Sequence, residues 1–366
     1  MKIGILGTRG IPNYHGGFEQ FAEFFAAFLA EKGHEVYVYS SHSHPYQEKT
    51  FMGAHIIHCN DPEEKIGTAG QFIYDLNCIL DAKKRNFDIL LQLGYTSNSV
   101  WYKLLPKKPL IITNMDGLEW KRSKYSKAVR HFLKHAEKWA VKSSDYLIAD
   151  SIGIQNYLEK TYKRESRYIA YGAEKFENPN VDVLKEYGLE TGGYNMLIAR
   201  MEPENNIETI LDGVAKAKQK TPFLVIGKHD TNAFGKHLTQ KFKEVEHIKF
   251  LGGIYNFDHL NNLRYYSNLY FHGHSVGGTN PSLLEAMASN ALIIAHKNEF
   301  NGKILEEDAF YFTNSDEVAG YIDSINDKST HKSFLCNNSD KISNLFAWDI
   351  INNKYLNFFE EVYAKD

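Results

Sequence analysis

Residues 272–296 read HGHSVGGTNPSLLEAMASNALIIAH. The apolar run LYFH leads into this stretch, and a glycine turn then precedes SLLEAMASN, a sequence typical of a helix. We expect Asn280 to be the N-cap of that helix and Pro281 its first residue. A strand, a glycine turn and a helix in this order predict a phosphate site at the start of the helix. The backbone donors of this site are the N–H groups of Gly277, Gly278 and Thr279.

Glu285 lies one turn inside the same predicted helix. Its carboxylate is suited to accept hydrogen bonds from two hydroxyls of a ribose, and a phosphate beside a ribose indicates a nucleotide. The alternative is a tight turn followed by a surface glutamate, and the pattern by itself leaves both interpretations open.

The composition predicts a globular protein of two domains. The chain has 366 residues, more than a single core of ordinary size takes up. Its hydrophobic content of 43% and aromatic content of 14% are typical of a chain with a large core. The three cysteines lie far apart and lack the C-x-x-C spacing of a zinc site, so we expect no disulfide framework and a reducing compartment. They are Cys59, Cys78 and Cys336.

The N-terminal residues and the lengths of the apolar runs both bear on localisation. The first residues, MKIGILGTRG, run directly into a predicted strand and lack the pattern of a signal peptide. No stretch approaches the roughly 18 apolar residues that a membrane span needs. We therefore expect a cytoplasmic protein. Its net charge of −3 gives no general attraction for nucleic acid, so no nucleic-acid partner is expected.

Short apolar runs alternate with helical segments along almost the whole chain, which predicts an α/β fold with two doubly wound parallel sheets in tandem. The first series of strands runs from KIGIL to SRYIAY, and the second runs from YNMLIA to AFYF. We predict an N-terminal domain over 1–172, a linker over 173–193 and a C-terminal domain over 194–345. Residues 346–366 have apolar positions at helical spacing and are predicted to form a helix that returns to the first domain.

Two glycine patterns follow the first predicted strand. Gly4, Gly7 and Gly10 have G-x-x-G-x-x-G spacing, and the second strand ends in Ser40-Ser41 rather than in an acid, so NAD binding is not predicted. Next, a Gly-Gly pair precedes an amphipathic helix. We expect this entry to contact a pyrophosphate or a sugar, and a flexible loop before a core helix is the alternative. The pair is Gly16 and Gly17.

The loop NMDGLEWKRSK follows the apolar strand PLIIT. Asp116 and Glu119 are therefore predicted to lie at the carboxyl end of a strand, where open α/β sheets bind their ligands. Two carboxylates at this spacing are suited to orient an acceptor hydroxyl or to take its proton. The alternative is an Asp-Gly turn in which Glu119 pairs with a neighbouring cation.

Two cations follow strands of the second series. Arg200 ends the run YNMLIAR, and Lys228 ends FLVIGK in the same layer. A guanidinium offers bidentate donors to a diphosphate and keeps its charge, and the lysine is a possible second donor. A solvated charge is the alternative for each residue alone.

The segment 121–142 is strongly basic. It holds eight Lys or Arg residues against the single acid Glu137, a local charge of +7, so the rest of the chain carries −10. We predict a basic amphipathic helix that contacts an anionic membrane surface, at the inner face of the cell membrane. Nucleic acid and a merely solvated face are the alternatives. The contact residues are Lys127, Arg130, Lys134 and Lys138.

The longer motifs resemble a known family. The tandem architecture, ARMEPENN and PSLLEAMASNALIIA are similar to the GT-B glycosyltransferases of family 4, over essentially the whole chain. More narrowly, GTRGIPNYHGGFEQFAE, NMDGLEWKR and HGHSVGGTNPSLLEAM resemble the bacterial polysaccharide rhamnosyltransferase subgroup.

The resemblance implies retaining transfer from a nucleotide sugar, without a bound metal or other cofactor, in a cleft between two Rossmann-like domains. In that picture Glu285 holds the donor ribose, Arg200 neutralises the leaving diphosphate, and the turn at 277–280 binds phosphate or sugar. Asp116 stands where many members have a histidine that faces the acceptor. The catalytic residues implied are thus Asp116, Arg200 and Glu285.

Two departures from the family pattern bear on specificity. Gly277 occupies the position where the family has an acid that contacts the donor sugar, and Asn205 lies where the family has a lysine. A missing sugar-side carboxylate suits a deoxy sugar, so we expect transfer of L-rhamnose from dTDP-rhamnose to a lipid-linked bacterial surface glycan. GDP-fucose or a UDP-hexose is the alternative donor. A GT-B nucleotide-sugar epimerase and a non-catalytic nucleotide-sugar-binding protein are the alternatives of other classes.

Overall fold

The computed structural model describes residues 1–14, 16–122, 125–276 and 278–365. Within these ranges the chain forms two units. Unit 1 contains residues 1–121, residues 125–171 and the chain from Trp348 onward, and unit 2 contains Arg122 and residues 172–347. Each unit is a Rossmann-like α/β unit built on a parallel or largely parallel sheet, as the sequence predicts.

Unit 1 is built on an eight-stranded sheet in the order β3-β4-β2-β1-β5-β6-β7-β8. Every neighbouring pair is parallel except β3 and β4, which are antiparallel. All strands except the two-residue β3 coincide with predicted apolar runs. The strands are β1 (Lys2–Leu6), β2 (Glu35–Ser41), β3 (Thr50–Phe51), β4 (Ala54–Cys59), β5 (Ile89–Leu93), β6 (Leu110–Asn114), β7 (Tyr146–Ala149) and β8 (Arg167–Tyr168).

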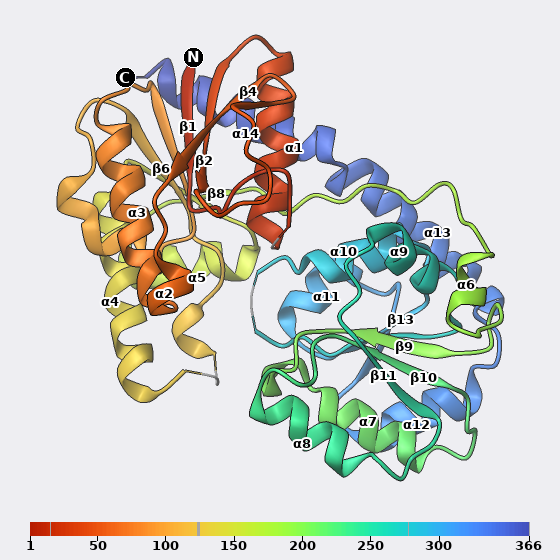
Figure 1. The fold of residues 1–366 in the computed structure, drawn as a ribbon. Coiled ribbons are helices and arrows are strands. Elements are labelled where there is room, and N and C mark those ends of the chain that lie inside the picture. Colours follow the sequence, from red (N-terminus) through yellow and green to blue (C-terminus); the bar gives the residue numbers. More distant parts are fainter. Residues whose placement is uncertain (15, 123–124, 277, 366) are drawn as a thin grey trace. The chain divides into compact units, whose positions relative to one another are not determined.

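Helices cover both faces of this sheet. Figure 1 shows α1 beside the C-terminal helix α14 on one side, and α3 and α4 on the other. The helices are α1 (Gly17–Glu31), α2 (Glu63–Ile66), α3 (Ala69–Ala82), α4 (Lys127–Ser143), α5 (Ile152–Tyr162) and α14 (Trp348–Tyr363), with 3-10 turns η1 (Asn98–Leu104) and η2 (Glu119–Lys121).

An aromatic cluster joins α14 to α1. The ring of Tyr355 lies 4.7 Å from that of Phe21 and 5.1 Å from that of Phe25. Trp348 stacks on Phe24 at 4.8 Å. The Tyr355 hydroxyl accepts a hydrogen bond of 2.9 Å from the Asn114 side chain at the end of β6, so the last helix is tied to the centre of the first sheet.

Unit 2 contains a six-stranded, wholly parallel sheet in the order β11-β10-β9-β12-β13-β14. The chain leaves β9 toward β10 and leaves β12 toward β13, so the winding direction reverses between β9 and β12. This is the switch point at which open α/β sheets bind ligands. The strands are β9 (Asn195–Ile198), β10 (Phe223–Ile226), β11 (Ile248–Gly252), β12 (Tyr270–His272), β13 (Ile293–His296) and β14 (Phe310–Phe312).

Figure 1 shows α7, α8 and α12 on one face of the second sheet and α9, α10 and α11 on the other. Apolar residues from β9, β10 and β12 form one buried cluster with those of α7, α8 and α12. The helices are α6 (Val183–Glu186), α7 (Ile207–Lys216), α8 (Ala233–Lys241), α9 (Phe257–Tyr266), α10 (Pro281–Ala288), α11 (Glu299–Leu305), α12 (Ser315–Ser324) and α13 (Lys332–Lys341), with 3-10 turns η3 (Pro203–Asn205) and η4 (Lys328–His331) and the π-helical turn η5 (Ile342–Phe346).

Two predicted helix boundaries need correction. The basic helix begins at Lys127 rather than 121, because the Ser126 side chain caps it by accepting the backbone N–H of Val129. The C-terminal helix begins at Trp348, and Phe346 belongs to η5. Residues 173–193, expected to form a linker, are part of unit 2 and include α6.

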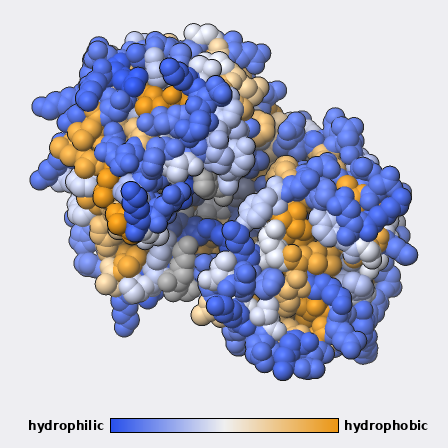
Figure 2. Space-filling view, viewed as in Figure 1, coloured by the Kyte–Doolittle hydropathy of each residue, from blue (hydrophilic) through white to orange (hydrophobic). Residues whose placement is uncertain are grey.

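No described helix is both long enough and apolar enough to cross a bilayer. Hydrophilic residues cover most of the face in Figure 2. Cys59, Cys78 and Cys336 are all free thiols.

We predict that Tyr355→Ala destabilises unit 1 by about 3–5 kcal/mol, because it leaves a cavity among the α1 and α14 aromatics. Tyr355→Phe keeps the ring and removes only the Asn114 hydrogen bond, and it should cost about 1 kcal/mol. Urea unfolding, followed by tryptophan fluorescence, measures both, since Trp348 lies in the same cluster. Equal losses for the two variants would contradict a packing role for the ring.

Candidate functional site

The candidate donor site lies at the switch point of unit 2, where the loops after β9 and β12 lie against each other. Gly273 follows β12, and a Cβ atom there would lie 2.0 Å from the Asn205 carbonyl oxygen. At Gly227, after β10, φ is +152° and a Cβ would lie 2.1 Å from the Ala199 carbonyl oxygen. Only glycine lets these loops approach so closely.

The predicted start of the helix after the glycine turn is confirmed. Asn280 is the N-cap of α10 and accepts a hydrogen bond of 3.0 Å from the Ser282 N–H, and Pro281 is the first helical residue. The Tyr270 and Ser282 hydroxyls lie 2.8 Å apart and link β12 to the first turn. Thr279 is buried, Gly278 is half-buried, and Gly277 lies outside the described residues.

Hydrogen bonds between side chains and backbone join the β12 loop to the β9 loop. The Asn206 side chain donates to the Gly273 carbonyl at 2.8 Å, and the Ser275 hydroxyl donates to the Glu204 carbonyl at 2.7 Å. Asn205 is buried and donates to the Arg200 carbonyl at 2.7 Å. The polar residues after β9 therefore hold Arg200 and the start of the glycine turn in one frame.

Two further asparagines, which the sequence analysis missed, support the turn from the β13 side. Asn298, the N-cap of α11, and Asn301 each donate a hydrogen bond of 3.0 Å to the His274 carbonyl. Asn301 also donates to the His296 carbonyl at 2.8 Å. In the sequence, residues 298–301 read NEFN, a pattern that predicts the start of a helix. This pattern does not show that both asparagines reach the loop after β12.

Glu285 has a buried partner that the sequence analysis did not find. Its Oε2 atom lies 2.5 Å from Nη2 of Arg264, which is fully buried on α9. Arg264 also donates to the Asn261 side-chain oxygen at 3.0 Å. The Glu285 side chain is 16% exposed, so the arginine fixes a carboxylate that still reaches solvent. The signal available was LRYY, and an arginine in a helix is normally read as a surface charge.

Arg200 and Lys228 follow the neighbouring strands β9 and β10, and both side chains are exposed. The Arg200 guanidinium and the Lys228 ammonium have different neighbours. The Lys228 Nζ lies 5.3 Å from the centre of the Tyr255 ring, on the β11 side of β10, and its hydrogen bond to Tyr255 raises the pKa of Lys228. Arg200 lies on the β12 side, near enough to His274 to lower its pKa.

Two histidines lie at the end of β12, where His272 is buried and His274 is half-buried. The rings of His272 and His274 stack at 4.5 Å. Burial, and then the charge of Arg200, lowers the pKa of His274 to about 3, and burial lowers the pKa of His272 well below its usual value. Both rings are therefore neutral at pH 7 and add no positive charge beside Arg200.

The Gly-Gly entry of unit 1 starts α1 as predicted, with Gly16 as the N-cap and Gly17 as the first helical residue. The Gly16 N–H donates to the Asn13 side chain at 3.1 Å, and the Gly17 carbonyl accepts a hydrogen bond of 2.9 Å from the Tyr171 hydroxyl. The φ of Gly16 is 178°, extended backbone that any residue adopts. Contact with a pyrophosphate stays a prediction.

The loop after β6 forms the predicted turn at Asp116-Gly117, where Gly117 has a φ of +63°. Tyr95, buried after β5, holds the loop from beneath. Its hydroxyl donates to the Gly117 carbonyl at 3.2 Å and accepts the Glu119 N–H at 3.3 Å. Asp116 and Glu119 are both half-buried at the carboxyl edge of the first sheet. Their predicted acceptor role stays a prediction.

Lys134 has a partner on its own helix, since its Nζ atom lies 2.8 Å from the buried carboxylate of Glu137, although the lysine side chain is still 36% exposed. Its contact with a membrane stays a prediction. Glu137 also accepts hydrogen bonds from Trp120 Nε1 at 2.9 Å and from the hydroxyls of Tyr157 at 2.7 Å and Tyr162 at 2.5 Å. This carboxylate joins η2, in the loop after β6, to α4 and α5. Lys127 and Lys138 are exposed, and Arg130 is half-buried.

Among the described residues, no three His, Cys, Asp or Glu side chains lie close enough together to hold a metal ion. Metal independence stays a prediction.

Glu285→Ala is expected to destabilise unit 2 by about 3–5 kcal/mol, because it leaves the buried Arg264 charge without its carboxylate. A double variant, Arg264→Met with Glu285→Leu, removes both charges and should lie closer to the wild-type protein. Urea unfolding measures all three proteins. A free energy of unfolding for Glu285→Ala within 1 kcal/mol of wild type would show that the ion pair is not needed for the fold.

Unit 2 should lose stability as the pH falls below about 6.5, the usual pKa of histidine. The folded pKa of His272 and His274 is lowered, so the unfolded chain binds more protons and each histidine costs about 1.4 kcal/mol per pH unit. In His272→Phe the slope between pH 6 and pH 5 should be shallower by about that amount. Melting temperatures across this range give the comparison, and equal slopes for the two proteins would contradict it.

Two family models match the chain. Residues 1–174 match a domain of unknown function, DUF1972, and residues 187–339 match glycosyl transferases group 1. Among curated proteins, none matches the chain.

Several solved structures share the fold over nearly the whole chain. The sucrose-phosphate synthase of Thermosynechococcus elongatus is 16% identical, with a TM-score of 0.81 and full coverage of both chains. A glycosyltransferase of Rickettsia africae is 16% identical, with a TM-score of 0.73, and covers 99% of this chain and 98% of its own. HepE of Anabaena, solved with UDP-glucose, is 14% identical, with a TM-score of 0.74, and covers 100% of this chain and 99% of its own. The second unit therefore contains a domain that matches glycosyl transferases group 1, and the chain as a whole has the GT-B fold.

Proposed function

We propose that the protein transfers a sugar from a nucleotide donor to a hydroxyl of a lipid-linked bacterial surface glycan, with retention of anomeric configuration. The observation that carries the proposal is the arrangement at the switch point of unit 2. There a capped helix start, Arg200 and the fixed carboxylate of Glu285 follow adjacent strands, within residues that match glycosyl transferases group 1.

The donor nucleotide is assigned to three features. The start of α10 directs the positive end of its helix dipole toward a phosphate, and the turn before it, which includes Gly278 and Thr279, is the proposed source of backbone N–H donors, because the Ser282 and Leu283 N–H groups already bond to Asn280. Arg200 supplies the charge that balances the diphosphate, with Lys228 as a second cation at its rim. Glu285 binds the ribose hydroxyls, since Arg264 holds one carboxylate oxygen and sets the orientation of the other.

The proposed donor sugar is L-rhamnose, carried by dTDP. HepE has been solved with UDP and with UDP-glucose, which supports a nucleotide sugar as the ligand class for this fold. Gly277 has no carboxylate for sugar hydroxyls, and a deoxy sugar has fewer hydroxyls to bind. GDP-fucose and UDP-hexoses are the competing donors.

In the proposed mechanism the bond between the sugar and the diphosphate breaks first, and Arg200 and the α10 N-terminus stabilise the charge on the departing oxygen. The acceptor hydroxyl attacks from the same face and gives its proton to that oxygen. Asp116, half-buried on a loop held by Tyr95 and Glu137, orients the acceptor. No metal is required because the protein itself supplies the compensating charge.

We also propose that α4 lies against an anionic membrane surface, where a lipid-linked acceptor is found. Lys127, Arg130 and Lys138 supply the contact, since Lys134 is engaged by Glu137. Solvated cations of this kind add about 1 kcal/mol each to the attraction for anionic lipid.

The donor proposal predicts that dTDP-rhamnose raises the melting temperature of the protein more than UDP-glucose or GDP-fucose does, since a ligand stabilises the state that binds it. Arg200→Ala should lower kcat/KM by about 100-fold or more, because it removes a charge at the leaving group. Lys236→Gln, which removes an exposed charge on α8, is the matched control. Thermal melting and product formation on a lipid-linked acceptor give the two measurements.

Three other outcomes would contradict the proposed function. No shift with any nucleotide sugar would contradict the donor site. Binding without transfer to any lipid-linked acceptor would favour a non-catalytic binding protein. Conversion of the nucleotide sugar without an acceptor would favour an epimerase.

A further inference from the structure

A basic cavity of about 490 Å³ lies in unit 1, between the 3-10 turn η2 and the first two turns of α4. The residues that line it are Trp120, Lys121, Lys127, Arg130, His131 and Lys134. No acidic side chain lines this cavity among the described residues, and four of its six residues are Lys or Arg.

The cations of this cavity differ in how their charge is balanced. Lys134 is paired with Glu137, and its Nζ atom lies 4.3 Å from the centre of the Trp120 ring. Within the described part of the chain, Lys121, Lys127 and Arg130 form no ion pair. Three cations without an ion-pair partner therefore line one hollow, and like charges on one cavity wall repel one another unless an anion binds between them.

The wall of the cavity is fixed. The indole Nε1 of Trp120 donates to the buried Glu137 carboxylate at 2.9 Å, which sets the orientation of the ring. Lys127 is the first residue of α4, so the positive end of a 17-residue helix also points to this end of the cavity. A rigid aromatic wall, a helix start and three cations are the features of an anion site rather than of a solvated face.

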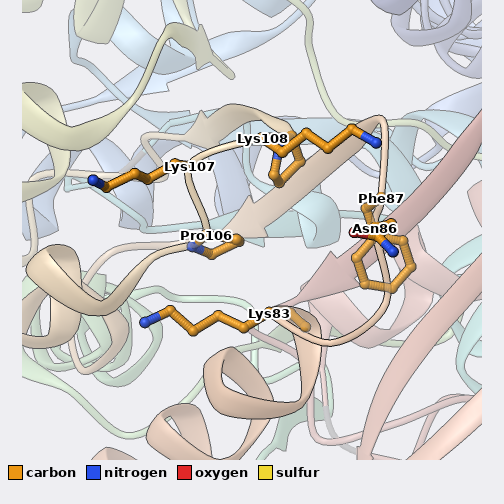
Figure 3. Close-up of a pocket in the computed structure, with 8 residues that line it drawn as sticks. Lys83, Asn86, Phe87, Pro106, Lys107 and Lys108 are labelled. Atoms are coloured by element: carbon orange, nitrogen blue, oxygen red, sulfur yellow. The ribbon is translucent and has the colours of Figure 1, made fainter.

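A second lysine-rich cavity shows the contrast. It has a volume of about 340 Å³ and is lined in part by Lys83, Lys107 and Lys108. Figure 3 shows Lys83 and Lys107 extending to one side and Lys108 to the opposite side, so the charges do not converge. This cavity also lies before β5 and β6, at the amino ends of the strands, away from the edge where α/β sheets bind ligands.

We propose that the cavity of Trp120, Lys121, Lys127 and Arg130 binds a diphosphate group. A phosphodiester carries one negative charge and leaves two of the three cations unbalanced, whereas a diphosphate carries two or more and offers several acceptor oxygens. The diphosphate that links an acceptor glycan to its lipid has this chemistry. That source rests on the proposed function, whereas the anion site itself rests on the cavity alone.

Titration calorimetry with inorganic pyrophosphate tests the site. The titration uses the full-length Arg200→Ala variant, so that the donor site of unit 2 contributes less to binding. In this background, Lys127→Gln with Arg130→Gln should weaken pyrophosphate binding by about tenfold or more, since two charge-assisted contacts to the anion are lost. The control Lys142→Gln with Lys160→Gln removes two exposed cations from α4 and α5 outside the cavity and should change the affinity less than twofold.

The two double variants distinguish binding in the cavity from nonspecific attraction to a positive surface. Equal weakening by the two double variants would overturn the proposal, because any positive surface would then suffice. So would the absence of pyrophosphate binding in a chain whose circular dichroism is unchanged. All substituted residues are exposed or half-buried at the surface, so a loss of affinity with unchanged spectra reports on the cavity.

Vesicle binding identifies the source of the diphosphate. Vesicles that contain a polyprenyl diphosphate should retain the protein more strongly than phosphatidylglycerol vesicles of equal charge, and Lys127→Gln with Arg130→Gln should abolish that difference. Equal retention would overturn the lipid-diphosphate assignment. The donor melting experiment reports on unit 2, so a protein that binds pyrophosphate but no nucleotide sugar would contradict the proposed function and not the anion site.

Discussion

The close approach of two strand-end loops in unit 2 is the constraint on which the candidate donor site depends. The loops after β9 and β12 lie on either side of the switch point, and Gly273 must lack a Cβ for them to meet. Their backbone groups are then satisfied by side chains from both sides, with Asn206 and Ser275 joining the two loops and Asn298 supporting the His274 carbonyl. A phosphate site formed by backbone N–H groups needs such a frame, because the donors must be held before the ligand arrives.

Unit 1 also holds a strand-end loop in a fixed conformation, but it does so with buried side chains. The loop after β6, which carries the candidate acceptor residues, is held by one buried phenol, Tyr95, and by one buried carboxylate, Glu137. Glu137 accepts four hydrogen bonds, from an indole, two phenols and the ammonium of Lys134, which offsets the cost of burying its charge. The same carboxylate that fixes the loop also fixes the wall of the basic cavity through Trp120. A single buried acid therefore positions both the candidate acceptor residues and the proposed diphosphate site.

Local patterns predicted most of the fold and part of the site. Apolar runs identified every strand of both sheets except β3, which is two residues long and has no period to detect. Asn280 and Pro281 predicted the start of α10 because capping is decided by neighbouring residues. Arg264 and Asn301 were missed because their roles depend on partners 21 and 27 residues away. The partner of Lys134 was missed although Glu137 is only three residues away, because no local pattern shows that this carboxylate is buried. The two helix boundaries failed by a few residues because Ser126 and η5 are interruptions that periodicity does not reveal.

The donor-site region of unit 2 carries few positive charges, and the departure from the family pattern at Asn205 contributes to this. Asn205 is buried and its side chain holds the Arg200 carbonyl, so a lysine at that position would have to bury an ammonium or break the loop. The neutral state of His272 and His274 removes a further source of positive charge beside the turn. In the proposed donor site, Arg200 and the N-terminus of α10 are therefore left to balance the charge of the diphosphate, because Lys228 is held toward Tyr255. A site with few cations around the leaving diphosphate must select its donor mainly by shape. The turn after β12, held by Asn206, Asn298 and Asn301, supplies a fixed shape for this.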